Sequence, residues 1–183
     1  NLAYTEHARR NLLAEGLHPR RTLVTGSPIR EVLDHYRPQI ESSDALARVG
    51  VPPREYFLVS AHREENVDSP RRLALLVESL NRIAGTWKVP VLVSTHPRTR
   101  KRLESDPTLI WNGLVRFHPP FGFLDYNKLQ LNSMCVLSDS GTISEESTMM
   151  EFPAITLRSS IERPEALDSG SITMTDLSPG DVV

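Results

Sequence analysis

A repeated alternation of short apolar segments with helical segments is the feature that most constrains this fold. The apolar segments lack alternating polar residues, which is typical of strands buried on both faces of a sheet. They lie at residues 56–61, 89–95, 114–118, 134–138 and 154–157. The expected helices between them begin after Ser69-Pro70 and at about residues 99, 124 and 142. Because strands that alternate with helices form parallel sheets, the sequence predicts a doubly wound α/β domain.

The first 50 residues predict shorter elements than the rest of the chain. Thr5 can cap a helix that Gly16 would end, and residues 21–25 form a short strand. A turn at residues 26–28 leads into a second helix, and a third short helix starts at Ser43. We therefore expect the regular α/β core to begin only after this region.

Composition and charge limit the classes of partner. The 183 residues, 39% of them hydrophobic, are enough for one domain with a proper core or at most two small ones. A formal net charge of -2 and a pI near 6.3 predict no nucleic-acid partner, since such domains usually carry a basic face. No apolar stretch is long enough to span a membrane, and no signal peptide is visible. The single cysteine, Cys135, lies in an apolar run, which predicts a core thiol and an intracellular setting.

Polar side chains gather where the expected strands end. They form the segments AHREEN (61–66), STHPR (94–98), HPP (118–120), SDSGT (138–142) and RSSIER (158–163). The carboxyl ends of parallel strands open into one crevice, which is where doubly wound sheets bind ligands. We therefore expect these segments to face a common site.

The segment Ser140-Gly141-Thr142 is suited to a phosphorylated ligand. Gly141 allows close approach to the backbone, and the helix that follows offers N–H groups and the positive end of its dipole. A diphosphate would fit there, although the sequence contains neither the GxxxxGK[ST] loop nor the GxGxxG fingerprint. A capped helix without a ligand is an equally good interpretation of this segment alone.

Charged residues near this segment extend the predicted site, and for most of them a structural role is the alternative. Glu146 either stabilises the helix start or turns inward to accept hydrogen bonds from a ribose diol. Arg63 suits a phosphate or a carboxylate. His62 can exchange protons near neutral pH, but a lone histidine at a strand end more often has a structural role. Arg163 either forms a surface ion pair or clamps a diphosphate. The histidines at the strand ends lack the ligand spacing of a zinc site, so we expect no metal.

Several motifs taken together resemble the non-hydrolysing UDP-N-acetylglucosamine 2-epimerases. They are TGSPIREVL (25–33), SAHREEN (60–66), STHPR (94–98), DSGTISEE (139–146) and ERPEA (162–166). Their order and spacing agree with the family across almost the whole chain. The family has two Rossmann-like domains arranged as in GT-B glycosyltransferases.

The resemblance implies which part of such a fold this chain forms. Residues 1–50 would join the two domains and start the second one. Residues 51–183 would form the UDP-binding Rossmann-like domain, truncated at its C-terminus. The chain would thus be the C-terminal half of a GT-B-type protein.

The resemblance also implies roles in UDP binding. Ser140 and Gly141 would hold the diphosphate through a hydroxyl and a backbone N–H. Glu146 would hold the ribose, and Arg163 the phosphates or the nearby loop. Tyr126 stands where the family has an aromatic residue near uracil.

A second group of residues is implied in catalysis and regulation. His62 corresponds to a histidine implicated in activity. In some bacterial members the counterparts of Arg63, Glu65 and His96 belong to an allosteric site for UDP-N-acetylglucosamine. The common HRREN motif reads HREEN here, and the reversed charge at Glu64 weakens the case for that regulation.

The family's reaction inverts C2 by eliminating UDP to form a 2-acetamidoglycal and re-adding it after exchange of the C2 proton. We therefore expect a cytoplasmic, homodimeric 2-epimerase of polysaccharide or capsule biosynthesis that converts UDP-N-acetylglucosamine to UDP-N-acetylmannosamine without a cofactor. Its carboxylates near C2 belong to the family's first domain, so this chain alone would be inactive. The HREEN form is more similar to a branch giving UDP-N-acetyl-L-fucosamine, and Thr142 replaces a glycine often found after DSG. A GT-B glycosyltransferase and a non-catalytic UDP-sugar-binding domain are the alternatives of other classes.

Overall fold

The structure, a computed structural model, describes residues 1–158, 172–175 and 177–182. Contacts divide the chain into two compact units, Asn1–Arg37 and Pro38–Val183. The division falls inside helix α2 (Ile29–Ser42), at the proline in its interior. A proline at such a position removes a backbone hydrogen bond and weakens the helix there. The domain boundary expected near residue 50 concerns a longer two-domain protein and stays a prediction.

The first unit is a small helix and strand arrangement. It contains β1 (Leu2–Ala3), α1 (Glu6–Ala14), the 3-10 turn η1 (Pro19–Arg21), β2 (Leu23–Val24) and the first part of α2. Thr5 caps α1 by accepting the N–H of Ala8 at 3.1 Å, as its residue type predicted. The strands pair in parallel, with Leu2 opposite Leu23. A two-residue strand such as β1 carries no periodic pattern, which is why the sequence did not predict it.

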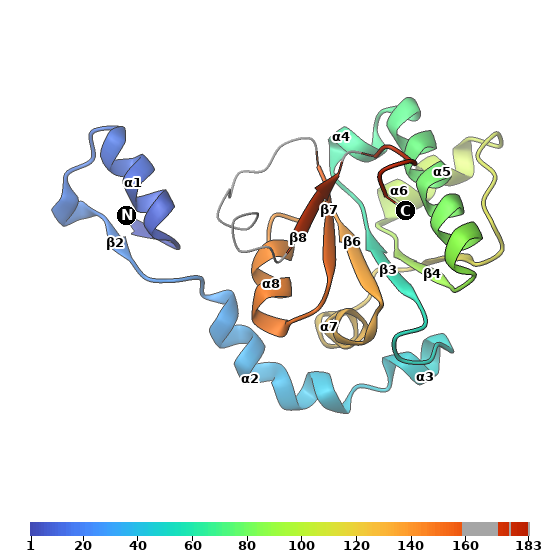
Figure 1. The fold of residues 1–183 in the computed structure, drawn as a ribbon, viewed down its shortest axis with the longest axis horizontal. Helices are drawn as coiled ribbons and strands as arrows, with labels where there is room; N and C mark the ends of the chain where they lie inside the picture. The colour runs from blue at the N-terminus through green and yellow to red at the C-terminus, as the bar shows by residue number, and fades with distance from the viewer. Residues whose placement is uncertain (159–171, 176, 183) are drawn as a thin grey trace. The chain divides into compact units, whose positions relative to one another are not determined.

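The second unit is built on a six-stranded parallel sheet (Figure 1). Its strands are β3 (Phe57–Ser60), β4 (Val91–Ser94), β5 (Val115–His118), β6 (Cys135–Ser138), β7 (Ala154–Leu157) and β8 (Ile172–Thr175). The order is β5-β4-β3-β6-β7-β8, so the chain runs outward from β3 in one direction and from β6 in the other. The order therefore reverses between β3 and β6. This arrangement confirms the prediction of a Rossmann-like, doubly wound α/β fold.

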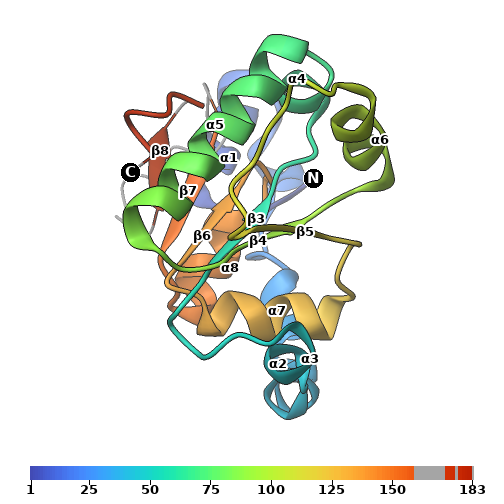
Figure 2. The ribbon, with the colours of Figure 1, turned by 90° about the vertical axis from the view of Figure 1, so that its right-hand side faces the viewer.

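Helices cover both faces of this sheet (Figure 2). The helices of this unit that follow α2 are α3 (Ala45–Val49), α4 (Glu64–Val67), α5 (Pro70–Trp87), α6 (Pro97–Ser105), α7 (Phe123–Asn132) and α8 (Ile143–Met150), of which α3 packs against α7. Figure 2 shows α5 and α6 on one side of the sheet, and α7 and α8 on the other. The apolar positions of α5 that the helical spacing predicted, including Leu73, Leu76 and Leu80, are buried against the strands.

The centre of the sheet explains why the strand segments are apolar throughout. Leu58, Val91 and Leu92 have no exposed surface, because helices lie over both faces. Strand β8 is different, since its central residues Thr173 and Met174 are exposed. Its mixed sequence, ITMT, has no buried-strand pattern, so this strand was not predicted.

Candidate functional site

The loops after β3 and β6 lie beside each other where the strand order reverses. These two strands are neighbours in the sheet, with Ser60 opposite Ser138 at their carboxyl ends. The loop after β3 carries His62 and Arg63, and the loop after β6 carries residues 139–142. Ligands of doubly wound sheets bind at such a switch point, so these loops form the candidate site.

Asp139 joins the two loops. Its side chain has no exposed surface, and its carboxylate accepts the N–H of His62 at 3.0 Å, the N–H of Arg63 at 2.9 Å and Nδ2 of Asn66 at 3.0 Å. A buried carboxylate is stable only with donors of this kind. No pattern in the sequence predicted a separate role for Asp139. The available signal was an acidic residue placed directly after a buried strand.

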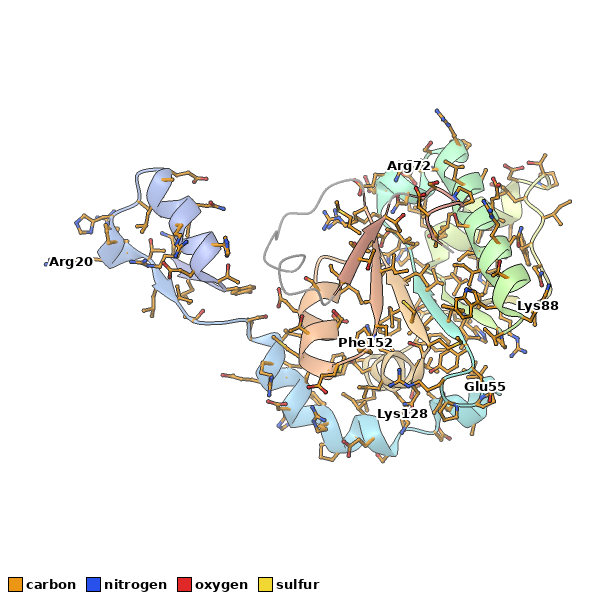
Figure 3. All side chains as sticks on the ribbon, viewed as in Figure 1. Arg20, Glu55, Arg72, Lys88, Lys128 and Phe152 are labelled. Atoms are coloured by element: carbon orange, nitrogen blue, oxygen red, sulfur yellow. The ribbon has the colours of Figure 1, made fainter. Side chains whose placement is uncertain are left out.

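Asn66 extends this network beneath the loops. Its Oδ1 accepts hydrogen bonds from Nε and Nη2 of Arg72, at 3.2 and 3.0 Å. Its Nδ2 also donates to the backbone oxygen of Leu157 at 3.2 Å. Arg72, labelled in Figure 3, lies in the first turn of α5. The amide of Asn66 thus connects a guanidinium to the buried carboxylate and fixes both loops to the sheet.

Arg63 is held next to Gly141. Its Nε donates to the backbone oxygen of Asp139 at 2.8 Å, which fixes the plane of the guanidinium. A Cβ built on Gly141 would lie 3.8 Å from Arg63 Nη2. The structure therefore brings Arg63, Ser140 and Gly141 together at the start of α8. A cation, a hydroxyl and an approachable backbone are the groups that an anionic ligand needs.

Glu146 is directed toward the same loop by hydrogen bonds. Its Oε1 accepts from Thr142 Oγ1 at 2.6 Å, and its Oε2 accepts from Gln130 Nε2 at 2.8 Å. Thr142 Oγ1 also lies 3.0 Å from Ser140 Oγ. The contribution of Gln130, a fully buried residue of α7, was not predicted from the sequence.

His62 and Tyr126 lie beside the ends of the two central strands. His62 Nδ1 is 3.7 Å from Asp139 Oδ1 and 3.4 Å from Ser60 Oγ, and 48% of its side chain is exposed. Because Nδ1 faces the buried carboxylate, Nε2 is directed away from it. Burial raises the pKa of Tyr126, and hydrogen bonds with Ser60 and Ser138 oppose part of that rise.

The two other residues predicted for an allosteric site, Glu65 and His96, are exposed at the beginning of α4 and directly before α6. Glu64, the residue that departs from the family motif, forms an ion pair with Arg98 at 2.8 Å. Arg98 also contacts Asp68, and hydrogen bonding to Glu64 is the largest cause that raises its pKa. The ion pair between Glu64 and Arg98 thus connects the first turn of α4 to the first turn of α6.

Arg163, the remaining predicted ligand-binding residue, lies outside the described residues, as does the rest of the ERPEA motif at 162–166. Among residues 1–158, 172–175 and 177–182, no cluster of three or more His, Cys, Asp or Glu side chains could hold a metal ion. In the same part of the chain, no helix combines the length and the apolar character that crossing a membrane requires.

Comparison with protein families and relatives gives one consistent result. The model of the family described as UDP-N-acetylglucosamine 2-epimerase matches residues 1–183. The protein of that name from Methanocaldococcus jannaschii is 34% identical over 175 residues, which cover 92% of this chain and 48% of the relative.

Solved structures agree with the sequence relatives. The UDP-N-acetylglucosamine 2-epimerase from Rickettsia bellii has a TM-score of 0.86 at 40% identity, and the match covers 100% of this chain and 48% of that one. The Methanocaldococcus jannaschii enzyme in complex with UDP-GlcNAc and UDP has a TM-score of 0.89 at 32% identity, covering 99% and 51%. The chain therefore spans about half the length of the relatives it matches.

Proposed function

This chain belongs to the UDP-N-acetylglucosamine 2-epimerase family, and we propose that it forms the UDP-binding half of an enzyme that interconverts UDP-N-acetylglucosamine and UDP-N-acetylmannosamine. The observation that carries the proposal is the meeting of Arg63, Ser140, Gly141 and Glu146 at the switch point of the sheet. The complex of a relative with UDP-GlcNAc and UDP supports a ligand of this class.

The diphosphate would lie against the loop after β6. Ser140 offers a hydroxyl, and Gly141 lets a phosphate oxygen approach the backbone N–H groups at the start of α8. Arg63, held by the backbone oxygen of Asp139, presents a planar guanidinium that matches phosphate geometry. Arg163 is proposed as a second cation on the phosphates, on the basis of the family motif.

The ribose would lie against Glu146. Each carboxylate oxygen already accepts one hydrogen bond, from Thr142 or from Gln130. A carboxylate oxygen can accept two, so each can take one more hydrogen bond from a hydroxyl group. The two adjacent hydroxyls of a ribose match this pair of acceptors. Tyr126 is proposed as the aromatic residue near uracil.

The proposed chemistry is elimination of UDP from C1 together with the proton from C2, followed by re-addition of UDP to C1 and of a proton to the other face of C2. Negative charge develops on the diphosphate as it departs, and positive groups placed there in advance stabilise the transition state. Arg63 is the positive group of the candidate site that would do so, and His62 lies beside it, where it can donate a hydrogen bond. The carboxylates that exchange the C2 proton would come from the other half of the protein. This chain alone would bind UDP without turnover.

For the whole protein, the proposal includes a cytoplasmic homodimer that acts in polysaccharide or capsule biosynthesis. The HREEN motif, whose Glu64 pairs with Arg98, favours one further candidate, a 2-epimerase that forms UDP-N-acetyl-L-fucosamine. Incubation of the full-length protein with each UDP-sugar and identification of the products by NMR would distinguish the two substrates.

The proposal is tested by isotope exchange and by binding. The full-length protein, incubated with UDP-N-acetylglucosamine in deuterium oxide, should incorporate deuterium at C2, whereas a glycosyltransferase would leave C2 unlabelled. Titration of the 183-residue chain with UDP, with AMP as the control, should give saturable binding of UDP alone. Arg163→Ala should weaken UDP binding by roughly tenfold or more, the effect of one charged hydrogen bond. Absence of both exchange and UDP binding would refute the proposed function.

A further inference from the structure

Thr142 stands at the N-cap position of α8, yet its side chain does not cap the helix. A threonine at this position ordinarily has extended backbone angles and accepts an N–H from the first turn. Here φ is −93° and ψ is −8°, which is helical, and the hydroxyl is directed to other side chains. It donates to Glu146 Oε1 at 2.6 Å and contacts Ser140 Oγ at 3.0 Å. The hydroxyl therefore lies between the two ends of the proposed nucleotide site.

The direction of these hydrogen bonds follows from the number of protons. An ionised carboxylate can only accept, so the contact with Glu146 uses the single hydroxyl proton of Thr142. The contact with Ser140 must then use the Ser140 proton, with Thr142 as the acceptor. The N–H of Thr142 in turn donates to Ser140 Oγ at 3.3 Å. Without a ligand, the proton of Ser140 points toward Thr142.

We propose that Thr142 is a positioning residue that couples the ribose end of the site to the diphosphate end. This inference rests on the proposed function. Thr142 holds Glu146 ready for the ribose, and at the same time it takes the hydroxyl proton that Ser140 needs for a phosphate oxygen. A diphosphate must displace this hydrogen bond in order to accept from Ser140. The same threonine thus favours one part of the ligand and competes with the other.

Removal of the hydroxyl should therefore weaken binding at the ribose end without weakening it at the diphosphate end. In Thr142→Val the side chain keeps its shape, and no helix cap is lost, because the hydroxyl does not cap α8. Glu146 loses one of its two donors and should bind a ribose less well. Ser140 regains a free proton and should bind a diphosphate equally well or better. A general disturbance of the loop would instead weaken both ligands.

The experiment uses two-dimensional NMR titration of the 183-residue chain, which measures weak affinities. The probes are UDP, uridine and inorganic pyrophosphate, applied to the wild type, Thr142→Val and Thr142→Ser. Thr148→Val is the matched control, since Thr148 donates to the backbone oxygen of Ser144 at 2.7 Å on the same helix. It removes a similar hydrogen bond without touching Ser140 or Glu146.

We expect Thr142→Val to weaken uridine binding by roughly threefold to tenfold, the effect of one hydrogen bond, and pyrophosphate binding not at all. Thr142→Ser and Thr148→Val should resemble the wild type. If uridine and pyrophosphate change alike in Thr142→Val, or if uridine does not bind while UDP does, the coupling is wrong and the UDP site stands. If the wild type binds none of the three probes, both the coupling and the proposed site are wrong.

Discussion

Deletion of the Asp139 carboxylate should destabilise the second unit more than the loss of any exposed carboxylate. Asp139 is fully buried, and Asp139→Ala leaves the N–H groups of His62 and Arg63 and the amide of Asn66 without their acceptor. An unsatisfied buried donor costs about 1 to 3 kcal/mol. Two of the three donors lie at the partly buried edge of the loop, where water can replace part of the interaction. We therefore expect a loss of about 3 to 5 kcal/mol, a large part of the about 5 to 15 kcal/mol of a typical domain.

Urea unfolding followed by circular dichroism measures this loss. With a typical dependence on denaturant, the midpoint should fall by more than about 1 M urea. Asp139→Asn keeps one acceptor oxygen and should lie between Asp139→Ala and the wild type. Asp44→Ala is the matched control, because its carboxylate pairs with Arg48 on the surface and is 71% exposed. Equal midpoints for Asp139→Ala and Asp44→Ala would refute the assignment of Asp139 as the residue that holds the two loops together.

Three further predictions use other parts of the second unit. Arg63→Ala should weaken UDP binding by roughly tenfold or more in a titration of the chain, and unchanged affinity would remove Arg63 from the diphosphate site. Burial raises the pKa of Cys135 to about 11, so mass spectrometry should find slow alkylation by iodoacetamide near neutral pH; rapid labelling would contradict a packed thiol. Burial, and secondly the charge of Arg116, lowers the pKa of His118 below its ordinary 6.5. The unfolded chain therefore binds a proton at His118 more readily than the folded chain does. Because of this difference, the free energy of unfolding should fall as the pH drops below 6.5. Urea midpoints at several pH values should show a smaller fall in His118→Asn, and an equal fall would refute the role of His118.

The sequence predicted the sheet well because its central strands are short, apolar and separated by clear helices. The helix α5 illustrates this, since its capping Ser69 and the spacing of its leucines both appear in the structure. The helix α4 was not predicted. It has only four residues, and its two buried residues, Asn66 and Val67, are adjacent in the sequence. Such a short segment shows no helical period.

The contacts within the site were harder to predict than the loops that carry them. Residues at the ends of β3 and β6 were expected to meet, because parallel strands end at the same edge of a sheet. The partners of Asp139 in the loop after β3 and in α4 are separated from it by 73 to 77 positions, and only the pairing of β3 with β6 brings them together. Gln130 was missed for a related reason, since a glutamine on an apolar helix gives no sign that it faces a carboxylate from another helix.

The two departures from the family's common motifs show why a motif difference has to be interpreted through its contacts. Glu64, in place of an arginine, forms an ion pair with Arg98. Because 78% of the Glu64 side chain is exposed, solvent screens this pair. Thr142, in place of a glycine, is half-buried, and its hydroxyl donates a hydrogen bond to Glu146 inside the proposed site. A glycine has no hydroxyl to give, so it would leave Glu146 with the donor from Gln130 alone and would leave the proton of Ser140 free for a phosphate. If the proposed site is correct, the exchange of glycine for threonine should change the balance between ribose and diphosphate recognition. The exchange of arginine for glutamate changes the charge of a surface that lies beside Arg63.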